Sequence, residues 1–310
     1  GLLTGDMSLN REASIIIMTT EIFRNMLYAE VDEEDDPLEG VETVVLDECH
    51  YMNDPQRGTV WEESIIHCPP SVQFVALSAT VENAGQLTDW ITEVHGPTDL
   101  VFSDFRPVPL TFNFCSAKGL HPLLNDQGTG LHPNNKVWRA PKGGKRKGRL
   151  SKALQPEAPS ISFVIEQMSQ REMLPGIYFI FSRRGCDKAV KDLGSLCLVS
   201  TKQQKIIRAR LREYTEANPK GVRDQLHIDA LLRGIASHHA GVLPAWKELI
   251  EELFQHGLVK LVFATETLAA GVNMPARSTV ISTLSKRTEN GHRLLMSSEF
   301  LQMAGRAGRR

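Results

Sequence analysis

Short apolar segments recur along the chain, and the intervals between them are long enough to hold a helix. Segments of this kind, bounded by turn residues and alternating with helical patterns, indicate strands of parallel sheets built from βαβ units. The segments are SIIIMT (14–19), VETVVLDE (41–48), VQFVALSAT (72–80), IYFIFS (177–182), IASHH (235–239), VKLVFAT (259–265) and STVIST (278–283). Their recurrence predicts an α/β fold with parallel sheets.

The segment PAWKELIEELFQ (244–255) shows the helical pattern between two predicted strands. Its apolar residues fall on one face of a helix, with Pro244 at the start and Gly257 after the end. These residues are Trp246, Leu249, Ile250, Leu253 and Phe254. The periodicity predicts that they belong to the core, which fits Trp246 and Phe254 better than a role in base stacking.

The chain of 310 residues is long enough for two cores, and 41% hydrophobic with 23% charged residues is typical of a globular protein. FRPVPL (105–110) predicts a hinge, because its two prolines exclude continued helix or central strand. We therefore expect one domain at 1–106 and a second at 107–310. The second carries a basic insertion at about 117–158, since residues 119–153 include eight basic residues and one acidic residue.

Charge and cysteine usage limit the partners and the compartment. A formal net charge of −2 means that a polyanion must be held by local basic patches, because the whole protein would not attract it. The acidic run EVDEEDD (30–36) indicates a solvated loop. Five scattered cysteines favour free thiols in a reducing compartment. No apolar run approaches the roughly 20 residues of a membrane span, and no leader pattern is present. We expect a soluble intracellular protein, and the start GLLTGD (1–6) indicates a fragment of a longer chain.

Two adjacent carboxylates, Asp47 and Glu48, follow a predicted strand in TVVLDECHYMND (43–54). Ligands of parallel α/β sheets bind at the carboxyl ends of strands, so this position suits chemistry. One interpretation is that Asp47 caps the next element and Glu48 is solvated. Another is a nucleotide hydrolase, in which Asp47 holds Mg²⁺ through water while Glu48 orients and deprotonates the attacking water.

Two further interpretations involve the residues that follow this pair. Cys49 could be a nucleophile beside His50, but sequence neighbours at a strand end point in opposite directions. A zinc site would need more ligands at suitable spacing, and the nearest are His67 and Cys68. Neither interpretation is favoured.

The segment QMAGRAGRR (302–310) places Arg306 and Arg309 three residues apart, so both could reach one charged group from a helix start. Guanidinium groups of this kind stabilise negative charge on a transferring phosphoryl group. A disordered basic tail would explain the segment equally well if it stood alone.

Six segments occur in the order and spacing of superfamily-two DExH helicases, and the chain most resembles the Ski-type RNA helicases of RNA decay and processing. They are DECH (47–50), SAT (78–80), YFIFSRRGCD (178–187), ASHHAG (236–241), FATETLAAGVNMPA (263–276) and QMAGRAGRR (302–310). TGD (4–6) and MTTEIFRNMLY (18–28) resemble the early RNA-contacting motifs of that family. The DECH spelling and the form of the insertion are similar to cyanobacterial and plastid members.

The resemblance implies two RecA-like domains of a P-loop NTPase helicase core, the first of them incomplete. No GxxxxGK[ST] segment occurs; the near match GGKRKG (143–148) follows its Gly-Lys with Arg and has no strand before it. The family pattern places the phosphate loop upstream of Gly1, and winged-helix and ratchet-like domains downstream of Arg310. We therefore expect little ATP affinity in the isolated chain.

The resemblance also implies ATP and Mg²⁺ as cofactors, bound in a cleft between the two domains that closes around ATP. Its catalytic residues would be Asp47, Glu48, Gln302, Arg306 and Arg309, with Mg²⁺ held by Asp47 through water. Its nucleotide-binding residues would be His50, Gly271, Asn273, Arg306 and Arg309. Ser78, Ala79 and Thr80 would couple nucleotide state to RNA, although SAT alone reads as an ordinary helix cap.

Single-stranded RNA, or RNA with a single-stranded tail, is the implied partner. The implied contacts are Thr4, Gly5, Thr19, Thr20, Arg183, Thr265 and Glu266. Contacts to phosphate and sugar predict weak sequence preference. His238 and His239 are expected to be packed or capping residues, with coupling as their only role. The basic insertion could be an RNA-binding arm, a solvated linker or a protein-docking loop.

The leading functional hypothesis is an ATP-dependent RNA helicase that moves 3′ to 5′ on RNA. We expect a monomeric motor that works with exosome-like or other RNA-processing proteins, without a membrane, in bacterial cytoplasm or plastid stroma. An RNA-binding clamp without essential ATPase activity and a DNA helicase of the same superfamily are the alternatives.

Overall fold

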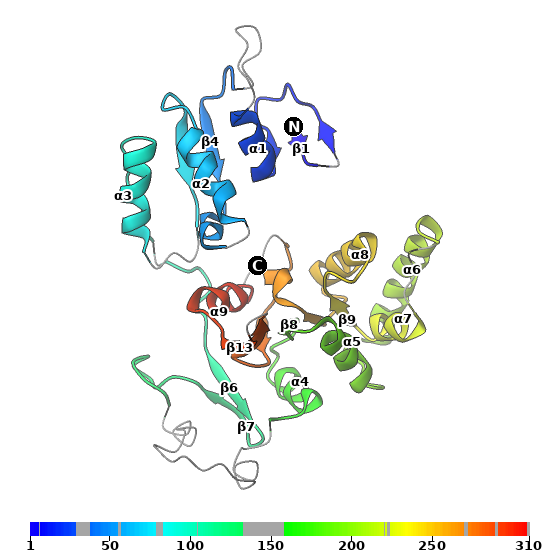
Figure 1. The fold of residues 1–310 in the computed structure, drawn as a ribbon. Coiled ribbons are helices and arrows are strands. Elements are labelled where there is room, and N and C mark those ends of the chain that lie inside the picture. Colours follow the sequence, from blue (N-terminus) through cyan, green and yellow to red (C-terminus); the bar gives the residue numbers. More distant parts are fainter. Residues whose placement is uncertain are drawn as a thin grey trace. The chain divides into compact units, whose positions relative to one another are not determined.

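The computed structural model describes residues 1–5, 7–28, 38–54, 57–78, 83–103, 105–132, 158–219, 221, 224–269, 272–288 and 291–308. Two compact units follow each other along the chain, Gly1–Phe105 and Arg106–Arg310. Figure 1 shows the elements of both units in chain order.

The first unit contains two small sheets. One has the order β2-β1-β3, from β1 (Leu2–Leu3), β2 (Ser8–Leu9) and β3 (Ile17–Met18), with β1 antiparallel to β2 and parallel to β3. The other pairs β4 (Thr43–Leu46) with β5 (Gln73–Ala76) in parallel. The strand predicted at 14–19 is therefore shorter than expected, because only its last part pairs with a neighbour.

The described residues of the first unit also form the helices α1 (Thr20–Leu27), α2 (Gly58–His67) and α3 (Ala84–Val94) and the 3-10 helix η1 (Cys49–Asn53). Trp61 and Ile65 lie four residues apart on α2, so they share one helix face. They pack with Leu46 of β4 and Ile91 of α3 in one buried cluster. The residues after β4 are thus held against a small core.

The second unit contains a four-stranded parallel sheet with the order β11-β8-β10-β9. Its strands are β8 (Gly176–Phe179), β9 (Ile235–His238), β10 (Leu261–Ala264) and β11 (Ser278–Ile281). Every residue of β8, β9 and β10 is buried. This burial explains their near-continuous apolar sequences, since a parallel sheet is covered on both faces. The predicted α/β class with parallel sheets is confirmed.

Helices cover both faces of this sheet. They are α4 (Ile161–Gln170), α5 (Arg183–Asp192), α6 (Thr201–Ala217), α7 (Gln225–Leu232), α8 (Pro244–Gln255), the 3-10 helix η4 (Glu266–Ala269) and α9 (Ser297–Ala304). Ile177 and Val262 pack in the cluster that includes α6 and α8, whereas Tyr178 and Phe263 pack in the cluster that includes α4 and α5. Alternate residues of each strand therefore face opposite layers.

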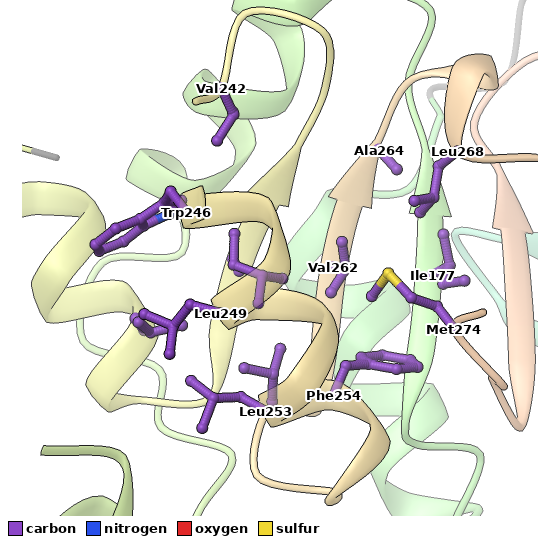
Figure 2. Packing of buried hydrophobic residues seen from close by; sticks show 14 of the residues in the cluster. Ile177, Val242, Trp246, Leu249, Leu253, Phe254, Val262, Ala264, Leu268 and Met274 are labelled. Carbon is purple, nitrogen blue, oxygen red and sulfur yellow. The ribbon is translucent and has the colours of Figure 1, made fainter. Parts of the chain in front are cut away.

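The predicted apolar face of α8 is confirmed. Trp246, Leu249, Ile250, Leu253 and Phe254 are all buried. Figure 2 shows Trp246, Leu249, Leu253 and Phe254 in the core that also receives Val262 from the sheet. Neither Trp246 nor Phe254 is available for base stacking in this packing.

Two antiparallel hairpins also belong to the second unit. One joins β6 (Asn113–Ser116) to β7 (Gly119–Pro122), and the other joins β12 (Ser285–Thr288) to β13 (Gly291–Leu294). Strand β7 lies within the residues at which the basic insertion was predicted. Backbone pairing with β6 forms the strand although its own sequence, GLHP, has little strand propensity.

Two charged segments lie outside the described residues. They are the most basic part of the insertion, residues 133–157, and the acidic run at 30–36. Among the helices in the described part of the chain, none is long and apolar enough to cross a membrane.

Candidate functional site

The DECH segment forms a tight turn directly after β4. Leu77 donates its backbone N–H to the carbonyl of Leu46 at 2.9 Å, and Cys49 donates to the carbonyl of Leu77 at 2.9 Å, so the turn is bonded to the end of neighbouring β5. Glu48 has a left-handed backbone with φ of 57°, and its N–H donates to Asp47 Oδ1 at 2.7 Å. A left-handed non-glycine residue costs of order 1 kcal/mol. The two carboxylates are held by backbone geometry.

Side chains of neighbouring elements brace this turn. Trp61 of α2 donates its indole N–H to the carbonyl of Asp47 at 3.4 Å. His50 Nδ1 lies 3.2 Å from Glu48 Oε2 and 3.4 Å from Ser78 Oγ. The structure thus brings together Asp47, Glu48, His50 and Ser78, whereas the predicted coupling residues Ala79 and Thr80 lie outside the described residues.

The chemistry of Cys49 argues against the cysteine–histidine interpretation. Its side chain is buried and its Sγ donates to the carbonyl of Leu46 at 3.1 Å. Burial raises the pKa of the Cys49 thiol to about 11. A thiol of this kind is almost fully protonated at neutral pH and is a poor nucleophile.

The carboxylate pair suits a hard divalent cation that takes most of its ligands from elsewhere. Asp47 is exposed and Glu48 is half-buried, so both carboxylates are accessible. No group of three or more potential metal ligands occurs among the described residues. Mg²⁺ is commonly held by one or two carboxylates together with waters and phosphate oxygens, which fits this pair, whereas structural zinc needs four protein ligands.

In the first unit, the predicted RNA contacts lie at one sheet edge. Thr4 and Gly5 follow β1, and Thr19 and Thr20 follow β3, its parallel neighbour. The N–H of Thr19 donates to the carbonyl of Leu3 at 3.3 Å, which ties the two loops together. Thr19 and Thr20 also stand at the start of α1, where the Glu21 carboxylate already accepts a backbone hydrogen bond.

In the second unit, the predicted RNA contacts also gather at the carboxyl ends of adjacent strands. Arg183 is exposed at the start of α5, which follows β8, while Thr265 and Glu266 follow β10. The strands are parallel neighbours, and the N–H of Ile180 donates to the carbonyl of Ala264 at 2.8 Å. The two loops therefore emerge side by side.

The predicted nucleotide-facing residues of the second unit lie on and beside α9. Gln302 is half-buried on α9, and Asn273 is exposed, with its carbonyl accepting from Gln255 Nε2 at 2.7 Å. Gly271 and Arg309 lie outside the described residues.

Arg306 is 5% exposed and points into its own unit. Its Nε donates to the carbonyl of Ala269 at 2.7 Å, and its guanidinium also bonds to the carbonyl of Val272. These bonds fasten the end of α9 to the segment after β10. A contact between Arg306 and phosphate stays a prediction.

Asp187, the last residue of the segment YFIFSRRGCD, is the centre of a polar network that was not predicted, and its side chain is half-buried. Asp187 Oδ1 accepts from His227 Nε2 at 2.9 Å, from Ser237 Oγ at 2.8 Å and from His239 Nε2 at 3.2 Å. Burial alone would raise the pKa of Asp187, but these hydrogen bonds outweigh it and lower the pKa. The network ties the start of α5 to the end of β9.

The two histidines of ASHHAG are buried, as expected. His239 reaches Asp187, and His238 Nε2 lies 2.7 Å from Glu251 Oε1 on α8. Burial lowers the pKa of His238 despite this carboxylate. Both histidines hold the loop after β9 and neither is presented as a catalytic group.

Two family models match the chain. The model described as DEAD/DEAH box helicase matches residues 4–87, and the model described as helicase conserved C-terminal domain matches residues 188–310. The first range contains Asp47, Glu48 and Ser78, and the second contains Glu266 and Arg306.

Several curated relatives are similar over 100% of this chain. A chloroplastic DExH-box ATP-dependent RNA helicase of Arabidopsis thaliana is 45% identical, and the alignment covers 30% of that relative. The probable helicase HelY of Mycobacterium tuberculosis is 40% identical with 36% covered, and an exosome RNA helicase of Mus musculus is 38% identical with 31% covered. The chain spans about a third of the length of these relatives.

Proposed function

Because the chain belongs to the DExH-box helicases of superfamily two, of the Ski type, we propose that it forms the RecA-like core of an ATP-dependent RNA helicase. The proposed activity is 3′ to 5′ movement on RNA with unwinding, in RNA processing or decay. The observation that carries the proposal is the pair Asp47 and Glu48, held at the end of β4 in contact with Ser78 through His50. The proposed domains are residues 1–106 and 107–310.

We propose ATP with Mg²⁺ as the cofactor. Mg²⁺, when bound, neutralises charge on the phosphate oxygens. Asp47 offers its exposed carboxylate to waters of the ion, and Glu48 accepts the proton of the attacking water. His50, between Glu48 and Ser78, passes a change at this turn to the end of β5.

Gln302, Asn273 and Arg306 are the proposed nucleotide-facing residues of the second unit, together with Gly271 and Arg309. Arg306 can contact the nucleotide only if its present hydrogen bonds are broken. Its guanidinium is bonded to the carbonyls of Ala269 and Val272, so it must exchange those bonds to reach phosphate.

Single-stranded RNA, or RNA with a single-stranded tail, is the proposed substrate. Thr4, Gly5, Thr19 and Thr20 bind its backbone in the first unit, and Arg183, Thr265 and Glu266 do so in the second. Backbone contacts give weak sequence preference. We also propose a monomeric motor with RNA-degrading or RNA-processing partners, because one matched relative is described as an exosome RNA helicase. Bacterial cytoplasm and plastid stroma are the proposed compartments, the latter because one relative is described as chloroplastic.

The substitution Glu48→Gln in the full-length gene product tests this function. RNA-stimulated ATP turnover should fall by about 10³-fold, because the base is lost while its shape is kept. Affinity for a single-stranded RNA oligonucleotide should stay unchanged. Glu42→Gln is the matched control, since Glu42 is an exposed carboxylate beside the other end of β4.

Three outcomes separate the alternatives. Cellular function that survives Glu48→Gln would favour an RNA clamp without essential ATPase activity. Stronger stimulation of the wild type by single-stranded DNA than by RNA would favour a DNA helicase. No hydrolysis by the wild type with any nucleic acid would exclude the motor.

A further inference from the structure

Four charged side chains of alternating sign lie in contact beside η4 in the second unit. Lys286 on β12 is directly opposite Arg293 on β13, and cations opposed in this way repel. Glu299, in the first turn of α9, lies between them: its Oε1 accepts from Lys286 Nζ at 2.7 Å and from Arg293 Nη2 at 2.6 Å. Lys286 Nζ also donates to Glu266 Oε2 at 2.5 Å. We name Glu266, Lys286, Glu299 and Arg293 the charge chain.

The centre of the charge chain is largely removed from water. The side chains of Lys286 and Glu299 are 13% and 17% exposed. Burial alone would raise the pKa of Glu299, but bonds from Arg293, Lys286 and the N–H of Met296 outweigh it and lower the pKa to about 2. Burial would likewise lower the pKa of Lys286, but its two carboxylate partners raise it. Removing Lys286 would therefore take one of two cations from Glu299, which keeps Arg293, and would break the ion pair at Glu266.

The charge chain is one of several attachments between the α9 region and the segment after β10 among the described residues. At the first turn of α9, Glu299 reaches Glu266 through Lys286. Just after the end of α9, Arg306 donates to the carbonyl of Ala269. Glu266 and Ala269 are the first and last residues of η4, and η4 packs against α9. A shift of η4 must therefore either carry α9 with it or break buried polar contacts.

We infer that Lys286 is a positioning residue that couples RNA contact at Glu266 to the helix that carries Gln302. This inference rests on the proposed function, which places Glu266 on RNA and Gln302 toward nucleotide. The ammonium also neutralises the Glu266 carboxylate, so that the phosphate backbone can approach η4 without repulsion. Lys286 belongs to none of the segments that carry the family resemblance.

The test compares basal with RNA-stimulated ATP turnover in the full-length gene product, using a single-stranded polyuridine oligonucleotide. In Lys286→Met the ratio of stimulated to basal turnover should fall about tenfold, within the range typical of coupling between sites. The KM for ATP should change by less than about twofold, because no contact at Asp47 or Glu48 is altered. Lys286→Arg should retain most of the stimulation, because a guanidinium can still bridge Glu266 and Glu299.

Arg287→Met is the matched control, since Arg287 is the next residue of β12, is exposed and faces the other side of the hairpin. Its stimulation should equal that of the wild type. If Lys286→Met fails to fold, Lys286→Gln replaces it, because the glutamine amide can still donate to Glu299 and so support the fold. The glutamine carries no positive charge, so the same loss of stimulation is expected.

Two results would overturn the inference while leaving the proposed function intact. One is equal stimulation of the wild type and the Lys286 variants. The other is a proportional loss of basal and stimulated turnover together with a lower thermal midpoint. Absence of RNA-stimulated turnover in the wild type would instead overturn the proposed function, so the two failures are distinguishable.

Discussion

The two units support the residues at their strand ends in different ways. In the second unit, β8, β9 and β10 are wholly buried, and polar side chains near the strand ends form networks around Asp187 and Glu299. In the first unit, Leu46 alone is buried among the residues of β4 and β5, and Val45 is 58% exposed. The carboxylates there depend on backbone hydrogen bonds, on the left-handed conformation of Glu48 and on contacts from Trp61 and His50.

This difference predicts different responses to perturbation. A buried polar network penalises the loss of any member, because the other members are left without partners in a medium of low dielectric. A turn held by backbone bonds over a small core can open locally at lower free energy. We therefore expect the DECH turn to be the more easily distorted site, and the loops of the second unit to be the more firmly fixed.

The largest effect should come from truncating the core tryptophan of each unit. Trp246→Ala should lower the free energy of unfolding of the second unit by about 4 kcal/mol, and Trp61→Ala that of the first by about 3 kcal/mol. Trp246 is 2% exposed within the large cluster of Figure 2, where the cavity cannot collapse. Trp61 lies in a smaller cluster whose partly exposed members, such as Trp90, can relax.

Amide hydrogen exchange followed by mass spectrometry measures the stability of each unit separately in each variant. Trp61→Phe is the control, since it keeps most of the packing but removes the donor to the Asp47 carbonyl. It should cost about 1 kcal/mol and should lower turnover more than stability. A larger loss of protection in the first unit than in the second, after the two alanine substitutions, would contradict the comparison.

A smaller effect is expected from two aspartates that accept hydrogen bonds. Asp187→Asn should destabilise the second unit by about 2 kcal/mol, because three donors, from α7, from β9 and from the residue after β9, converge on one charged oxygen. Asp54→Asn should cost less than about 1 kcal/mol, because Asp54 accepts locally from the N–H of Arg57 and asparagine can do the same. Thermal midpoints of the two variants measure the difference, and an equal shift would remove the distinction between the units.

Much of this architecture could be predicted from the sequence, because burial on both faces leaves a readable signal. The apolar runs of β8, β9 and β10 and the helical face of α8 are of this kind. The position of Asp47 and Glu48 also followed, since an apolar run that ends in two carboxylates marks a strand end. Each of these elements could be predicted because its pattern lies within one short stretch of sequence.

Contacts between distant residues left no such signal. The donors to Asp187 lie 40, 50 and 52 residues away in the chain, and no spacing rule connects them. The strand β7 forms by pairing with β6 and not by its own propensity. The bonds from the Arg306 guanidinium to carbonyls of its own unit were likewise not predicted, and its contact with phosphate stays a prediction.

The last prediction concerns pH and would sharpen the comparison within the second unit. The folded pKa of Glu299, about 2, lies below its ordinary value of 4.5. A depressed folded pKa contributes stability that is present above the ordinary pKa and is lost as pH falls through the folded one. Glu299→Gln should therefore cost about 2 kcal/mol at pH 7, and the difference from the wild type should shrink between pH of about 4.5 and about 2.

Glu213→Gln is the matched control, because Glu213 also pairs with an arginine, Arg210, but its side chain is 63% exposed. Solvent screens an exposed pair so that it contributes little to stability, and this variant should follow the wild type at every pH. Urea unfolding of the wild type, Glu299→Gln and Glu213→Gln at pH 7, 4 and 3 gives the free energy of unfolding of each protein as a function of pH. If Glu299→Gln loses stability in parallel with the wild type as pH falls, the carboxylate is not held ionised by the charge chain. In that case the firm support attributed to the second unit would rest on apolar packing and on the polar network around Asp187.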